Sequence, residues 1–393
     1  MTVREYQDLL TRAQAGDGDA QFALGYHFDV DLHDYAAAWK WYQVATEQNS
    51  SAAWNNMAYM LADGEGRPAD PALAVQYFRK AAELGDEDGR FNCACTLEEI
   101  AATEEEWREV VRLYRTSGQS SGHYNLGILY DYGNEFIPVD HRKANRWYRR
   151  AADAGHAEAA TNLGVNLYKG IGCRKSCRES FLYTRFAAEN GDSLAFRSLA
   201  QDYAFGEGIR RNDSRAFYWF KRSWFARRDA PTAGWIGDFY VRGRGVKKDV
   251  RKAYLWLKRA AKLGEEGALF DLGFYFVSGK RNWPKDAERG RAFLEQYLAL
   301  HPDDDDALYW KGISYGTCRA LAIPCFERIY RMNRDPLSAY RMVELEIAGT
   351  RYWSPEEFAR LSEMLRTAAR AKVPGAVRLI RSRRWKRLRL NVL

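Results

Sequence analysis

Small and large apolar residues follow one another in a pattern that returns about every 36 residues. Residues 159–164 read Ala-x-x-x-Leu-Gly, and nearly the same spacing recurs at 195–200, 233–237 and 268–273. The apolar positions of such a segment lie on one face of a helix with 3.6 residues per turn. A period between 20 and 50 residues is typical of stacked repeats. The pattern therefore predicts an array of repeats that each begin with a helix.

The second half of each repeat keeps the same period. A Gly-x-Gly such as Gly170 and Gly172 separates the halves, and glycine ends helices because it adopts the left-handed conformation. Asp213 and Asp249 stand where an acid suits the start of a second helix. We expect each repeat to be a helical hairpin whose large aromatic residue packs against small ones. That aromatic recurs at Trp41, Tyr77, Tyr114, Trp147, Tyr183, Trp219, Trp256 and Phe293.

These residues resemble the Sel1-like repeat family, which is related to the tetratricopeptide repeats. Residues 126–155 fit the family pattern well, and residues 236–264 fit it best. The matching residues there are Ile236, Gly237, Tyr240, Gly243, Gly245, Val246, Asp249, Lys252, Ala253, Trp256, Arg259, Ala260, Ala261 and Gly264. The resemblance implies an all-α fold. It would be a right-handed α-solenoid of stacked helix-turn-helix repeats, with about eight or nine repeats and a helical C-terminal cap.

The repeat pattern also predicts the domain organisation. Residues 1–300 form the Sel1-like array, in which residues 89–118 keep the period but lose most of the signature and are a degenerate repeat. Residues 301–335 form a divergent repeat that resembles tetratricopeptide units. Residues 336–393 form a helical cap, because terminal repeats expose one face to water and are atypical.

Charge is distributed unevenly along the chain. The net charge is +8, and residues 371–393 contain basic residues but no acidic ones, so residues 1–370 are formally neutral. We call 371–393 the basic tail, and its spacing predicts an amphipathic helix. Such a helix either caps the last repeat or binds an acidic partner, a membrane surface or nucleic acid, and both interpretations remain open. The basic residues that define it are Arg378, Arg381, Arg383, Arg384, Lys386, Arg387 and Arg389.

The best candidate for a binding site is the inner groove. In tetratricopeptide-like stacks the first helices line the concave face, and the positions two before and two after the leucine point into it. Large aromatic residues with polar ones between them would suit an extended peptide or a helix. By this resemblance the partner-binding groove contains Phe22, Tyr26, Asn55, Tyr59, Tyr124, Ile128, Thr161, Val165, Arg197, Gln201, Asp238, Phe270 and Phe274.

Signals for catalysis or metal binding are weak. The six histidines are scattered, and no P-loop, Gly-x-Ser-x-Gly or His-Glu-x-x-His motif occurs. Cys173 and Cys177 lack the second pair of ligands that a zinc site needs. We expect no catalytic residues, no metal and no cofactor. No apolar run is long enough to span a membrane and no signal peptide is visible, so a cytoplasmic protein with reduced thiols is expected.

The sequence thus predicts a non-enzymatic scaffold or adaptor that binds a partner protein or peptide through the concave face of the repeats. Two alternatives remain. The basic C-terminal helix could recruit the protein to a membrane, to nucleic acid or to an acidic partner. The groove could instead neutralise a toxin or effector, as immunity-type binders do. Neither the identity of the partner nor the oligomeric state follows from the residues.

Overall fold

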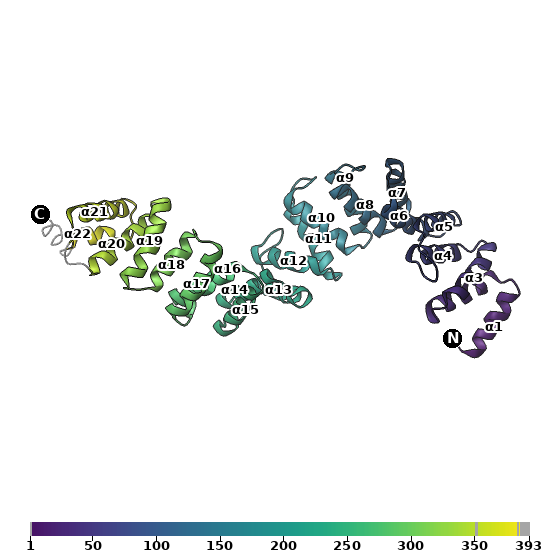
Figure 1. The fold of residues 1–393 in the computed structure, drawn as a ribbon, viewed down its shortest axis with the longest axis horizontal. Coiled ribbons are helices and arrows are strands. Elements are labelled where there is room, and N and C mark those ends of the chain that lie inside the picture. Colours follow the sequence, from purple (N-terminus) through teal and green to yellow (C-terminus); the bar gives the residue numbers. More distant parts are fainter. Residues whose placement is uncertain (1, 350–352, 383–384, 386–393) are drawn as a thin grey trace. The chain divides into compact units, whose positions relative to one another are not determined.

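The described part of the chain is helical throughout. The computed structural model describes residues 2–349, 353–382 and 385, and no strand occurs among them (Figure 1). This confirms the predicted all-α class. The contacts divide the chain into two compact units, residues 1–211 and 212–393, and the boundary between them falls inside the predicted array.

The first unit begins with one helix and continues with five helix pairs, followed by the first helix of a sixth repeat. Within a pair the two helices pack together, and the second helix also packs against the first helix of the next pair. The elements are α1 (Val3–Gln14), α2 (Gly18–Tyr26), the π-helical turn η1 (His27–Asp31), α3 (Tyr35–Glu47), α4 (Ser51–Asp63), α5 (Pro71–Glu83), α6 (Gly89–Ile100), α7 (Glu104–Thr116), α8 (Ser120–Tyr132), α9 (His141–Asp153), α10 (Ala157–Lys169), α11 (Cys177–Glu189) and α12 (Ser193–Phe205).

The second unit has the same pairwise packing. Its acidic run at 303–306 starts a helix, because the Asp304 side chain accepts a hydrogen bond from the backbone of Ala307 at 2.8 Å. The elements are α13 (Asp213–Arg227), α14 (Ala230–Arg242), α15 (Val250–Lys262), α16 (Glu266–Ser278), the 3₁₀ turn η2 (Lys280–Asn282), α17 (Ala287–Leu300), α18 (Asp305–Ser314), α19 (Arg319–Asn333), α20 (Pro336–Gly349), α21 (Pro355–Arg370) and α22 (Ala376–Arg381).

In most repeats, the side chain that packs against the small residues lies one position after the predicted aromatic residue. A Cβ atom on Gly127 would lie 2.3 Å from Cδ1 of Tyr148, whereas Trp147 is only half-buried. The predicted contact was therefore wrong by one residue, and Tyr114 belongs to the inner row. The eight side chains at these inner positions are all buried, and we call them the deep row. They are Tyr42, Phe78, Tyr114, Tyr148, Thr184, Phe220, Leu257 and Leu294.

The two glycines of each Gly-x-Gly have different roles. Gly170 ends α10 with a φ of +79°, the left-handed conformation expected of a helix cap. Gly172 lies against the start of α9, where a Cβ atom would be 2.5 Å from the carbonyl carbon of His141. The first glycine is therefore required for its conformation, and the second also for close packing of the loop.

Polar side chains cap the second helices. Asp249 accepts a hydrogen bond from the backbone N–H of Lys252 at 2.9 Å, as the sequence predicts. Asp213 also lies at a helix start as predicted, as the first residue of α13, whose cap is Asn212. The Asp213 carboxylate pairs with Arg244 at 2.8 Å.

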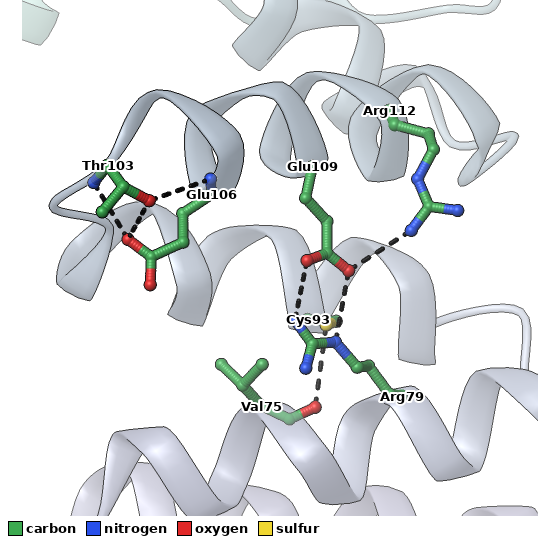
Figure 2. Close-up of polar contacts among 7 residues, drawn as sticks. All are labelled: Val75, Arg79, Cys93, Thr103, Glu106, Glu109 and Arg112. Atoms are coloured by element: carbon green, nitrogen blue, oxygen red, sulfur yellow. Dashed lines mark hydrogen bonds and ion pairs between the residues drawn. The ribbon is translucent and has the colours of Figure 1, made fainter. Parts of the chain in front are cut away.

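The segment 89–118 keeps a helix pair despite losing the glycine loop. Thr103 and Glu106 form a capping box, in which the Thr103 hydroxyl accepts from the backbone of Glu106 and the Glu106 carboxylate accepts from the backbone of Thr103 (Figure 2). Arg79 of α5 donates two hydrogen bonds to Glu109 of α7, the shorter of 2.7 Å (Figure 2). A local cap and this ion pair thus hold α7 in place without the family signature.

Replacing Thr103 by alanine is expected to lower the free energy of unfolding by about 1 kcal/mol, because the backbone N–H of Glu106 loses its acceptor. Urea unfolding followed by far-ultraviolet circular dichroism measures the change. Thr116→Ala is the matched control, since the hydroxyl of Thr116 only returns a hydrogen bond to its own helix. Equal losses in the two variants would contradict the capping role.

The end of α22 contradicts the prediction of an amphipathic helix that runs through the basic tail. Helix α22 ends at Arg381, because Ser382 has an extended backbone with ψ of 147°. Trp385 is buried, with its ring 5.1 Å from that of Phe358 on α21, which agrees with a capping role. Arg378 and Arg381 of the basic tail lie in α22. The other predicted tail residues lie outside the described part of the chain, namely Arg383, Arg384, Lys386, Arg387 and Arg389.

Candidate functional site

The predicted groove residues all lie on first helices, and we call the surface that these residues define within each unit the first-helix face. Three of them are exposed: Tyr26 (48%), Tyr59 (42%) and Val165 (37%). Thr161 is buried, and its hydroxyl donates a hydrogen bond to the Asp192 carboxylate. The half-buried ones are Phe22, Asn55, Tyr124, Ile128, Arg197, Gln201, Asp238, Phe270 and Phe274.

Several half-buried residues of this face pack or bond to neighbouring helices. Asn92 donates a hydrogen bond to Asn55 at 2.9 Å, which ties α6 to α4. Tyr124 of α8 stacks on His156 at a centroid distance of 4.4 Å, and His156 caps α10. These side chains are therefore fixed in orientation, and their exposed edges form part of a pre-organised surface.

The aromatic residues at the far end of the predicted groove lie together in the second unit. Phe270 and Phe274 lie one turn apart on α16, with ring centroids 6.3 Å apart. Phe274 also meets the edge of Trp310 on α18, and Phe270 packs against Tyr297 on α17. Their rings link three helices, so packing between helices accounts for much of their buried area.

The structure brings Val165, Arg197 and Gln201 together around one pocket of the first unit. This pocket has a volume of about 510 Å³ and opens between α10, α11 and α12. We call it the Thr184 pocket, after the deep-row residue in its wall. Its remaining lining residues are Gly164, Tyr168, Lys169, Ser180, Ser198, Asp202, Phe205 and Glu207.

A second pocket, of about 420 Å³, lies between α14, α15 and α16 and contains the predicted groove residues Asp238 and Phe270. Asp238 forms an ion pair with Arg242 at 2.5 Å. Burial and the nearby Asp238 carboxylate raise the pKa of Asp271 to about 6. This pocket of the second unit therefore contains a buried carboxyl group, that of Asp271, beside the Asp238–Arg242 ion pair.

Side chains that could bind a metal or take part in redox chemistry do not cluster in the described ranges. No group of three or more histidine, cysteine, aspartate or glutamate residues with metal-binding geometry occurs in the described ranges. The six cysteines are free thiols. Burial raises the pKa of the Cys93 thiol to about 11, and its sulfur points to the carbonyl oxygen of Val75 (Figure 2). Such a protonated thiol is a poor nucleophile.

Helix length and polarity bear on membrane insertion. In the part of the chain that the structure describes, no helix is both long and apolar enough to cross a membrane.

Sequence reasoning missed the most unusual residue of the first-helix face. Asp202 is 7% exposed, and its Oδ2 atom has no hydrogen-bond partner. The sequence did contain a signal for this residue. The equivalent positions in the preceding and following repeats are Asn166 and Phe239, whereas position 202 is an acid. Tyr168 and Phe205 at the rim of the pocket were also missed.

Comparisons with known proteins identify partial relatives. The chain is 26% identical over 243 residues to an uncharacterized protein of Neisseria meningitidis serogroup B, covering 61% of this chain and 49% of that protein. It is 24% identical over 168 residues to chitin synthase regulatory factor 2 of Schizosaccharomyces pombe, covering 41% of this chain and 32% of that protein. The chain therefore spans about half or less of the length of these curated relatives.

A solved structure shares the fold over most of the chain. It is a protective antigen present in uropathogenic Escherichia coli strains, with a TM-score of 0.73 and 23% identity, covering 94% of this chain and 80% of that one. The Sel1 repeat model matches residues 18–50, 51–86, 120–156, 157–192, 197–223 and 234–265. These matches leave out the degenerate segment 89–118 and together cover about half of the chain. The chain belongs to the Sel1 repeat family.

Proposed function

We propose that this protein is a non-enzymatic scaffold that binds a partner protein or peptide through the first-helix face. Sel1 and tetratricopeptide-like repeats are in general protein–protein interaction scaffolds. The observation that carries the proposal is the row of partly exposed aromatic side chains on this face, with Tyr26 and Tyr59 about half exposed. Large rigid aromatic residues are the usual anchors of protein interfaces.

The fixed orientation of the neighbouring side chains supports the same proposal. Tyr59 packs edge-on against Phe78 at 5.2 Å, and Tyr26 lies beside Phe22 at 6.3 Å. A surface whose side chains are already ordered loses little conformational entropy when a partner binds. The first-helix face therefore has both the anchors and the rigidity that a binding surface needs.

Replacing Tyr26 and Tyr59 by serine is expected to weaken partner affinity at least about tenfold, because interface aromatic residues commonly contribute more than 1 kcal/mol each. A partner captured with the full chain is first produced in pure form, and isothermal titration calorimetry then gives the affinity. Leu182→Ser is the matched control. Leu182 is 47% exposed, as Tyr26 is 48% exposed, but it lies on the second helix α11.

Two results would contradict the proposal. One is an affinity of the double tyrosine variant equal to that of the unmodified chain. The other is binding that persists in the double tyrosine variant but is lost in a second variant, in which basic residues of the tail are replaced by glutamine. The residues replaced are Arg383, Arg384, Lys386, Arg387 and Arg389.

A further inference from the structure

Three tyrosines of the deep row share one arrangement. Each ring lies against its own first helix, and each hydroxyl donates a hydrogen bond to a carboxylate of that helix or, for Tyr42, of the turn η1 that directly follows it. The ring fills the space beside the small residue, as Tyr42 does at Gly25, where a Cβ atom would be 2.5 Å from the ring. The pairs are Tyr42 with Asp29 at 3.0 Å, Tyr114 with Glu98, and Tyr148 with Asp131 at 3.2 Å.

The pair α10 and α11 departs from this arrangement. Its deep-row residue is Thr184, and the small residue opposite is Gly164, so two small residues face each other. The Ser180 hydroxyl donates to the Gly164 carbonyl at 2.8 Å and does not fill the remaining space. No ring separates the two residues, since a Cβ atom on Gly164 would lie 2.8 Å from Oγ1 of Thr184, and the Thr184 pocket of about 510 Å³ opens beside them.

Asp202 lies in the lining of this pocket without the partner that its counterpart has. One repeat earlier, Asn166 donates a hydrogen bond to Asn145 at 2.9 Å. The residue equivalent to Asn145 is Phe181, which offers no polar atom. The Oδ2 atom of Asp202 therefore has no hydrogen-bond partner, although the side chain is more than nine-tenths buried. A buried carboxylate without a partner is costly to keep.

The charges around Asp202 define which ligand chemistry would satisfy it. Burial and the neighbouring Glu207 carboxylate raise the pKa of Asp202 to about 7. Lys169 and Arg197 also line the pocket, on its α10 and α12 sides. The Tyr168 hydroxyl donates a hydrogen bond to the Glu207 carboxylate at 3.1 Å, and the Tyr168 ring is partly exposed. The pocket thus combines the apolar side chains of Val165, Tyr168 and Phe205 with a buried carboxylate that has an unsatisfied oxygen.

We infer that the Thr184 pocket receives the lysine or arginine side chain of a partner polypeptide, with Asp202 as the acceptor for its cationic head. The inference rests on the proposed function and adds the chemistry of one anchor to it. The apolar stem of such a side chain lies along Val165 and Tyr168, while the cation meets the carboxylate. Basic side chains bury their methylene stems in this way while the charged head reaches a polar partner. Charge-assisted hydrogen bonds of this kind are about twice as strong as neutral ones.

The inference is tested on the full chain with probes that need no identified partner. The probes are Nα-acetyl-L-arginine N-methylamide and the corresponding lysine derivative, and the neutral isostere is the citrulline derivative. Saturation-transfer difference NMR titrations give each affinity. At about pH 8, where Asp202 is ionised, we expect a basic probe to bind at least about tenfold more tightly than the citrulline probe, because only the cation satisfies the charge of Asp202.

Two variants locate the binding. Thr184→Tyr restores the side chain that the chain uses at Tyr148, and Asp202→Asn removes the charge. Each is expected to weaken binding of the basic probe at least about tenfold. Asp131→Asn is the matched control, because Asp131 is an acid of a first helix whose carboxylate already binds Tyr148 and His141. It is expected to leave probe binding unchanged. Circular dichroism verifies that each variant is folded.

Three outcomes would overturn the inference: no binding of either basic probe, equal binding of the citrulline probe, or undiminished binding in both variants at the pocket. Free L-arginine serves as a further arm. If it binds more tightly than the capped probe, the pocket takes a free small cation and not a polypeptide side chain. A failure here, with partner binding still dependent on Tyr26 and Tyr59, would leave the proposed function standing.

Discussion

Replacing Gly208 by alanine is expected to lower the free energy of unfolding of the first unit by about 3 kcal/mol or more. Gly208 has a φ of +71°, a conformation that costs a residue with a Cβ about 1–2 kcal/mol. A Cβ atom there would also lie 2.1 Å from the carbonyl oxygen of Cys177. Because that oxygen belongs to the backbone, the helix start itself must move, and such overpacking typically costs a further 1–3 kcal/mol.

Gly191→Ala separates the two contributions. Gly191 has a φ of +93°, but nothing lies within 4 Å of the position that its Cβ atom would take. This variant is expected to lose only about 1–2 kcal/mol, the cost of the conformation. Urea unfolding followed by circular dichroism measures both variants. Equal losses would mean that the close approach of the loop to α11 contributes nothing to stability.

Replacing Asp202 by asparagine is expected to stabilise the protein by about 2–4 kcal/mol at about pH 8. The pKa of Asp202 is raised from an ordinary value of 3.8 to about 7, chiefly by burial. A difference of this size corresponds to about 4 kcal/mol when the carboxylate is ionised. Asparagine removes the charge but still buries an amide, so part of this amount remains.

The pH dependence of this effect has a definite sign. The folded protein holds a proton on Asp202 up to about pH 7, whereas the unfolded chain releases it near pH 3.8. Folding therefore takes up a proton in this window, and stability falls as the pH rises through it. The stabilisation by Asp202→Asn should be small at about pH 4 and reach its full size above about pH 7. A gain of the same size at both ends, measured by urea unfolding, would contradict the account.

The two expected effects of Asp202→Asn run in opposite directions. Stability is expected to rise, while affinity for a basic side chain is expected to fall. Residues that cost stability without a structural benefit are typical of binding sites, because function and not folding maintains them. Such a result would distinguish Asp202 from acids such as Asp131, which contribute to the fold.

The repeat period made most of the fold predictable, because each glycine and cap has a local physical role. Gly170 and Asp249 function as their spacing indicates. The deep row was less predictable, because adjacent aromatic residues such as Trp147 and Tyr148 both fit a helical period and only packing decides which is buried. The division into two units near residue 211 also has no signal in the sequence, since the repeat pattern continues across it.

The candidate site was predictable only in part. The rule of two positions before and after the leucine placed Val165, Arg197 and Gln201 at one pocket. The same rule included Thr161, but this side chain is buried, and its hydroxyl donates a hydrogen bond to Asp192. Asp202 was missed because its lack of a partner depends on the side chain at position 181, in another helix. Burial and pairing of polar groups require the structure, whereas the face of a helix can be read from spacing.

A partner is expected to bind the first helices and not the second ones. Hydrogen–deuterium exchange of the full chain, with and without its purified partner, tests this most directly. We predict slower exchange on binding along α2, α4, α10 and α12, with α3, α5, α9 and α11 unchanged. Protection confined to the second helices, or to residues after Arg370, would contradict the claim.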